Sequence, residues 1–137
     1  MGQQQLLLIV LGVIIVGVAV VLGIQYFSTG AEEAAKDELV AHSTIVAANA
    51  QQWFRKPVAL GGGGNSFTTA SGAQLSYPAY FTQKLVNLHS TTNGTYVVAA
   101  SGDTAVTITA TPIPSAGFKF LNVVTTVGPS TTSSIIN

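Results

Sequence analysis

The 137-residue chain contains no cysteine. Disulfide bonds, thiolate metal sites and cysteine nucleophiles are therefore excluded. Charge is also scarce: acidic and basic residues make up 7% of the chain, and five of each sign cancel, whereas globular proteins average roughly 25%. Because no strong field exists to attract a polyanion, we expect no nucleic-acid partner.

Residue types that carry catalysis or bind metals are few. His42 and His89 are the only histidines, and neither has a second ligand type at metal-site spacing. Asp103 is the only acid after Glu38, so the C-terminal half lacks a carboxylate pair for acid–base chemistry. The glycine run 61–64 lacks the Lys-Ser or Lys-Thr of a phosphate loop, which favours a flexible turn. We therefore expect no enzyme activity, no cofactor and no catalytic, cofactor-binding or metal-binding residues.

The N-terminal region has a long apolar run, from Leu6 to Ile24, without one charged residue. As a helix this run spans about 29 Å, close to the hydrocarbon thickness of a bilayer. A removable signal peptide is a weaker interpretation, because Met1 to Gln5 contains no Lys or Arg. The run therefore predicts a membrane-spanning helix.

Three glycines, at positions 12, 17 and 23, interrupt the apolar run. Small residues allow apolar helices to approach one another closely, which favours helix-on-helix packing. Glycine is also simply commoner in membrane helices than in soluble ones. Spacing alone leaves both explanations open.

Good helix formers and the absence of proline before Pro57 predict that the helix continues beyond the apolar run. Gly30 is the weak point, where we expect a bend. If the helix restarts near Thr29, its acidic residues lie near its beginning and Arg55 and Lys56 at its end, which matches the helix macrodipole. Starting from Ala35, one face carries the residues expected to dock on the rest of the protein: Leu39, His42, Val46, Ala50 and Trp53.

Unbroken, this helix would be about 80 Å long, far longer than the helices of ordinary globular proteins. A helix of that length cannot bury its first half in the small domain that follows. The first half must therefore find apolar surroundings in lipid or among the same helices of other copies.

The C-terminal half alternates short runs rich in Thr, Val, Tyr and Phe with turn residues, which predicts strands at 95–100, 105–111 and 118–127. Residues 78–88 predict a short helix or turn that brings Leu85 and Val86 into the core. The tail, with Ile135 and Ile136, predicts either an edge strand or a contact with a neighbour.

Asn93-Gly94-Thr95 is an acceptor sequence for glycosylation, so Asn93 is a candidate modification site. The same residues suit a hairpin turn equally well.

Together these patterns predict an α+β fold. A long N-terminal helix, apolar in its first half and amphipathic in its second, packs on a small antiparallel β-meander. We divide the chain into an apolar helix at 1–27, its amphipathic continuation at 28–57 and a β-rich globular domain at 58–137.

This organisation resembles that of the type IV pilins, and the similarity lies mainly in residues 3–27 and in the helix end AANAQQWFRKP. The family's leader is cut after a glycine, which Met1-Gly2-Gln3 offers without a basic leader. Met1 is then the mature N-terminus, the start of a very short leader, or part of an unprocessed chain. Gln3, Gln4 and Gln5 stand where the family usually has a glutamate that pairs with a neighbour's amine. The helix-breaking proline and the C-terminal disulfide loop common in the family are absent.

The resemblance implies a pilin-like structural subunit of an extracellular filament, a helical homopolymer on the cell surface like a pilus or fimbrium. It also implies an inner-membrane pool before assembly, and assembly machinery as a partner. A minor pseudopilin-like component of a secretion or uptake machine, and a single-pass membrane-anchored binding module, are the alternatives. The residues expected to form the filament core are Leu6, Leu7, Ile9, Val10, Val13, Ile14, Val16, Gly17, Val20, Val21 and Ile24.

Overall fold

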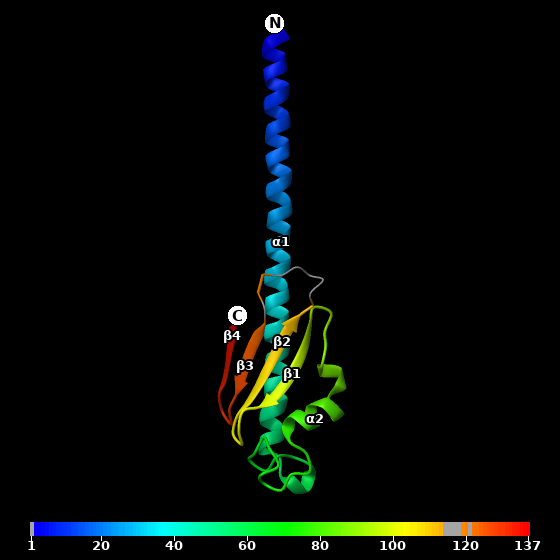
Figure 1. Ribbon diagram of the computed structural model, residues 1–137, viewed down its shortest axis with the longest axis vertical. Helices are drawn as coiled ribbons and strands as arrows, with labels where there is room; N and C mark the ends of the chain where they lie inside the picture. The colour runs from blue at the N-terminus through cyan, green and yellow to red at the C-terminus, as the bar shows by residue number, and fades with distance from the viewer. Residues whose placement is uncertain (1, 114–118, 121) are drawn as a thin grey trace. The chain divides into compact units, whose positions relative to one another are not determined.

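The computed structural model describes residues 2–113, 119–120 and 122–137. Its contacts divide the chain into two compact units, Met1–Ala34 and Ala35–Asn137. In chain order the elements are α1 (Gly2–Arg55), the 3-10 helix η1 (Val58–Leu60), α2 (Tyr77–Lys84), the 3-10 helix η2 (Val86–Leu88), β1 (Gly94–Ala100), β2 (Val106–Pro112), β3 (Val123–Val127) and β4 (Thr132–Ile136) (Figure 1).

The α1 helix is 54 residues long and is helical through Gly30 without interruption. The Thr29 hydroxyl donates to the Gln25 carbonyl oxygen at 3.0 Å, which satisfies the hydroxyl within the helix. Since α1 begins at Gly2 and does not restart near Thr29, the acidic residues after Gly30 face no helix N-terminus. Of the charges expected to interact favourably with the helix macrodipole, only Arg55, in the last turn of α1, does so.

The four strands form one antiparallel sheet in the order β1-β2-β3-β4, a simple meander (Figure 1). The register places Ile108 opposite Val98 on one side and opposite Thr125 on the other. Buried and exposed side chains alternate along β1, β2 and β3, as expected for a sheet with one covered face. The two expected hairpin strands at 95–100 and 105–111 match β1 and β2 closely, and the tail forms edge strand β4. The expected strand at 118–127 is observed only from Val123, and part of its beginning lies outside the described residues.

Residues 35–55 of α1 lie across one face of this sheet and share its core. The fold is therefore α+β with a long N-terminal helix packed on an antiparallel sheet, as predicted, and it is compatible with a pilin-like architecture. Contact between helix and sheet is very close at Gly94, where an added Cβ would overlap a Leu39 methyl group and lie 3.0 Å from the Thr111 carbonyl oxygen. Gly94 thus serves the helix–sheet contact, since β1 begins there.

The segment before the sheet contributes different core residues from those expected. Tyr77 and Phe81, one turn apart on α2, are fully buried. Leu85 is only partly buried, and Val86 is 61% exposed, so the expectation for Val86 is wrong. The larger aromatic rings fill the end of the core: the ring of Tyr77 lies 5.6 Å from that of Trp53 and 6.1 Å from that of Phe67.

The glycine run after α1 is tied to the end of the helix, in contrast to the flexible turn expected. Backbone N–H groups of Gly63, Gly64 and Asn65 donate to the carbonyl oxygens of Trp53, Lys56 and Phe54, at 2.8 to 3.0 Å. These bonds satisfy acceptors that a helix C-terminus otherwise leaves unpaired. An added Cβ at Gly63 would overlap the Ser66 carbonyl oxygen and the Trp53 ring.

We predict that Gly63→Ala destabilises the globular unit by about 2 kcal/mol, because backbone must move to admit the methyl group. Denaturant unfolding of the full chain in detergent micelles, followed by Trp53 fluorescence, measures this. Gly30→Ala is the control, since an added Cβ there meets nothing within 4 Å and alanine favours the helix. Equal stability of the two variants would contradict the assignment of a packing role to Gly63.

Candidate functional site: the apolar surface of the N-terminal helix

The first unit is a single helical segment whose apolar side chains face outward. None of residues 2–34 is buried, and its large aliphatic side chains are between 54% and 69% exposed. A helix that is apolar on every side requires apolar surroundings on every side. This surface is the candidate functional site.

All eleven residues predicted for a filament core lie on this surface and are exposed. The aliphatic residues that the prediction omitted, Leu8, Leu11, Ile15, Val18 and Leu22, are exposed to the same extent. The prediction favoured one part of the helix circumference, but the single chain does not distinguish one part from another. The sequence feature that indicates all of these exposed aliphatic residues is the apolar run from Leu6 to Ile24, which contains no charged residue.

The length and composition of α1 are sufficient for one membrane crossing. The apolar run corresponds to about 29 Å of helix, so it matches a bilayer core without a large mismatch. A membrane-anchored state is therefore compatible with the structure.

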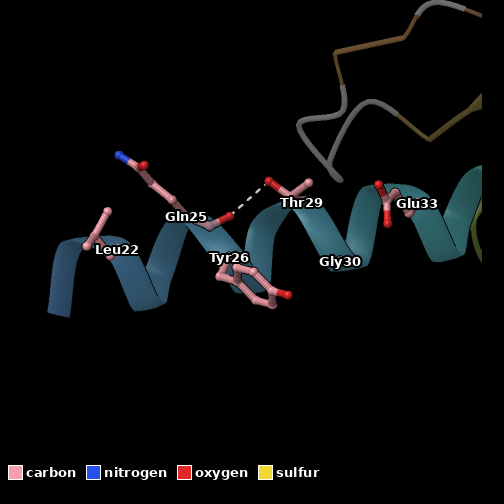
Figure 2. A pocket seen from close by; sticks show the side chains of 6 residues that line it. All are labelled: Leu22, Gln25, Tyr26, Thr29, Gly30 and Glu33. Carbon is pink, nitrogen blue, oxygen red and sulfur yellow. Dashed lines mark hydrogen bonds between the residues drawn. The ribbon is translucent and has the colours of Figure 1, made fainter. Parts of the chain in front are cut away.

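Polar and aromatic side chains mark the end of the apolar run. Tyr26 and Phe27 are 85% and 83% exposed, and Figure 2 shows the side chains of Gln25 and Tyr26 projecting from the helix in different directions. A shallow hollow on this part of the helix is lined by Leu22, Gln25, Tyr26, Thr29, Gly30 and Glu33. Exposed aromatic rings at such a boundary suit the headgroup level of a bilayer. We find in this hollow only one carboxylate and no histidine, so it offers no acid–base pair.

The predicted docking residues all belong to the second unit. Leu39, Val46 and Ala50 are fully buried and Trp53 is 4% exposed. His42 is half-buried: its Nε2 lies 3.2 Å from the Leu88 carbonyl oxygen, and its ring lies 4.3 Å from the Tyr96 ring. The prediction did not include Ser43, Ala47 and Phe54, which are also buried on this face of α1. Ser43 and Phe54 lie four residues after Leu39 and Ala50, and Ala47 lies three before Ala50, and these helical spacings were a signal for this wider face.

Asn93, the candidate glycosylation site, lies just before β1. Its side-chain amide donates to a carboxylate oxygen of Glu38, and its carbonyl oxygen accepts from the Ile113 N–H at 3.0 Å. Asn93 therefore ties the beginning of the sheet to α1. Whether it also carries a glycan stays a prediction.

His89 and Tyr96, two titratable residues of the second unit, make hydrogen bonds within the globular unit. The Nε2 atom of His89 lies 2.9 Å from the Phe81 carbonyl oxygen. Burial raises the pKa of Tyr96, and its hydrogen bond with Thr91 works in the opposite direction. Within residues 2–113, 119–120 and 122–137, no three His, Cys, Asp or Glu side chains are grouped as metal ligands would be.

No protein-family model matches this chain, and neither the curated proteins nor the solved structures contain a significant match to it. The similarity to type IV pilins therefore lies in the architecture and in the sequence features described above.

We predict that Tyr77 makes the globular unit sensitive to alkali. Its hydroxyl donates to the Val46 carbonyl oxygen at 3.1 Å, and burial, followed by the proximity of Tyr80, raises its pKa above the ordinary value of 10.0. Above pH 10 the unfolded chain loses this proton while the folded chain keeps it. The free energy of unfolding should therefore fall by about 1.4 kcal/mol per pH unit from this group alone, with no effect below pH 10.

Denaturant unfolding at a series of alkaline pH values tests this expectation. Tyr77→Phe should lower stability at neutral pH, because the hydrogen bond is lost, but should flatten the alkaline slope. Tyr26→Phe is the matched control, because Tyr26 is exposed. An alkaline slope that is identical in Tyr77→Phe and in the unmodified chain would show that Tyr77 is not the responsible group.

Proposed function

We propose that this chain is the structural subunit of an extracellular helical filament of the type IV pilus-like kind. In this proposal, the apolar runs of successive copies, residues 6–24, bundle as the core of the filament, and the globular units form the outer shell. The supporting observation is that no residue of this segment is buried in its own chain, although it is apolar on all sides. The globular unit has a complete core without it.

Burial of this segment is energetically large. Surrounding it with its copies removes on the order of 1500 Å² of apolar surface from water, worth tens of kcal/mol at about 25 cal/mol per Å². Leaving a bilayer for a helix bundle gains no such term, because lipid tails are as apolar as leucine. Transfer from a membrane pool must therefore depend on close packing between helices and on work done by assembly machinery.

Small residues on one side of the helix provide a surface for such packing. Gly12, Ala19, Gly23 and Gly30 follow one another at spacings of seven, four and seven residues. At 3.6 residues per turn they lie within about 20° of one line along α1. Gly17 lies about 140° away from that line. In a filament, this line of small residues is where neighbouring helices approach most closely.

The same surface also fits a minor component of a related machine or a simple membrane anchor. An abundant filament subunit is favoured because the globular unit has few charges and a surface rich in Thr, Ser, Asn and Gln, which suits extensive contact with neighbours. One repeated contact that does not close into a ring is sufficient to generate an open helix.

We predict that Gly12→Leu and Gly23→Leu each reduce filament yield at least about tenfold while the chain still reaches the membrane. A bulky side chain separates neighbouring helices, but it adds hydrophobicity and therefore favours insertion. An added Cβ at either glycine meets nothing within 4 Å in the single chain, so the fold of the chain itself should tolerate the larger side chain. Filaments are sheared from cells, weighed and imaged by electron microscopy, and the membrane pool is measured by immunoblotting.

The control is Gly17→Leu, which makes the same chemical change on another side of the helix and should reduce yield less. A loss of yield in Gly17→Leu as large as in the other two variants would show that the small residues do not mark the closest contact. Finding only membrane-bound monomer in the unmodified strain, with no fibre containing this chain, would refute the filament itself.

A further inference from the structure

A hollow in the globular unit is lined by residues from the C-terminal ends of two helices, α1 and α2. Its volume is about 370 Å³, and Lys56, just after α1, and Lys84, in the last turn of α2, both line it. In Figure 1, α2 lies beside this end of α1. Volumes of this size are typical of small-ligand sites.

Aromatic and apolar groups form the body of the hollow. Trp53 is nearly buried, and its ring centre lies 6.0 Å from that of half-buried Tyr80. Leu60, on the rim, is 67% exposed. A second hollow of about 140 Å³ shares Trp53, Lys56 and Tyr80 with the first and adds the amides of Asn49 and Gln52. The combined surface offers ring faces, amide groups and two cations.

The charge of the hollow is positive. No carboxylate is among its described lining residues, and the acids of the chain are Glu32, Glu33, Asp37, Glu38 and Asp103. Both lysines are exposed, so their ammonium groups can reach an incoming anion. The two lysines also suit their positions at helix C-termini, where cations are favoured. Stabilising two separate helix C-termini does not require the two lysines to lie near each other, whereas here both line the same hollow.

The backbone at this site disfavours phosphate as the anion. Phosphate sites usually use free N–H groups at helix N-termini or in glycine loops. Here the adjacent helix ends are C-terminal, and the N–H groups of Gly61 and Gly62 already donate to the carbonyl oxygens of Val58 and Pro57. A singly charged group on an otherwise neutral, hydroxyl-rich ligand fits these surroundings better.

We propose that this hollow binds an acidic sugar. Lys56 and Lys84 hold the carboxylate of a hexuronate unit, and Tyr80 lies against the sugar ring. Gln74 lines this hollow and Gln52 lines the adjoining one, so their amides can bond the hydroxyl groups of the sugar. The proposal concerns the globular unit alone, so it is independent of whether the chain polymerises.

Trp53 is the only tryptophan in the chain, so its fluorescence reports on this site. The full chain in detergent micelles is titrated with digalacturonate, with the uncharged disaccharide digalactose and with inorganic phosphate. We expect saturable fluorescence change with digalacturonate only. Lys56→Gln and Lys84→Gln should each weaken binding about tenfold, the loss expected for one charge-assisted hydrogen bond.

Lys119→Gln is the matched control, because Lys119 is exposed but does not line the hollow. Its affinity for digalacturonate should equal that of the unmodified chain. No saturable response, an equal response to digalactose, or tighter binding of phosphate would each overturn the proposal. So would unchanged affinity in both Lys56→Gln and Lys84→Gln, once circular dichroism shows that they are folded.

Discussion

The packing of residues 35–55 of α1 across the sheet is the contact on which the rest of the globular unit depends. Small side chains at Ala35, Ser43, Ala47 and Ala50 let the helix lie close to the strands. Gly94 has no side chain, which leaves room for the Leu39 side chain against β1. The large side chains Leu39, Val46 and Trp53 then fill the space between the two layers. At the helix end, the glycine loop satisfies the free carbonyl groups and closes over Trp53. A meander of five- to seven-residue strands has little core of its own, so the helix supplies much of the apolar surface that stabilises it.

This arrangement uses only the C-terminal part of a 54-residue helix. The folding free energy of the globular unit therefore does not bury the apolar run at residues 6–24, which must obtain apolar surroundings from other molecules. Lipid and other copies of the chain provide equivalent surroundings as far as the hydrophobic effect is concerned. What distinguishes them is packing density, since only another helix can fit closely against the line formed by Gly12, Ala19, Gly23 and Gly30.

Periodicity and composition predicted the helix, the α+β fold and most strand positions, because an apolar spacing of three or four residues and an alternating strand pattern are local signals. The helix continues through Gly30, as the sequence predicted, because one glycine costs only about 1 kcal/mol and good helix formers surround it. The burial of Tyr77 and Phe81 and the closing of the glycine loop were not predictable, since both depend on contacts between segments far apart in sequence. The hollow beside Lys56 and Lys84 was missed for the same reason: the two residues are brought together only by the docking of α2 near the end of α1.

The glutamines at the ends of the apolar run bear on how a bundle of such helices sets its register. Apolar surface alone specifies register poorly, because two uniform apolar helices can slide along one another with little change in buried area. Gln3, Gln4 and Gln5 precede the run and Gln25 follows it. A slide of one turn or more moves one of these amides into the apolar core, where an unpaired amide costs about 1 to 3 kcal/mol. In a filament, the amides would therefore limit the stagger from both ends without any charge pair. The register would then be insensitive to salt, because no ionised side chain takes part in it.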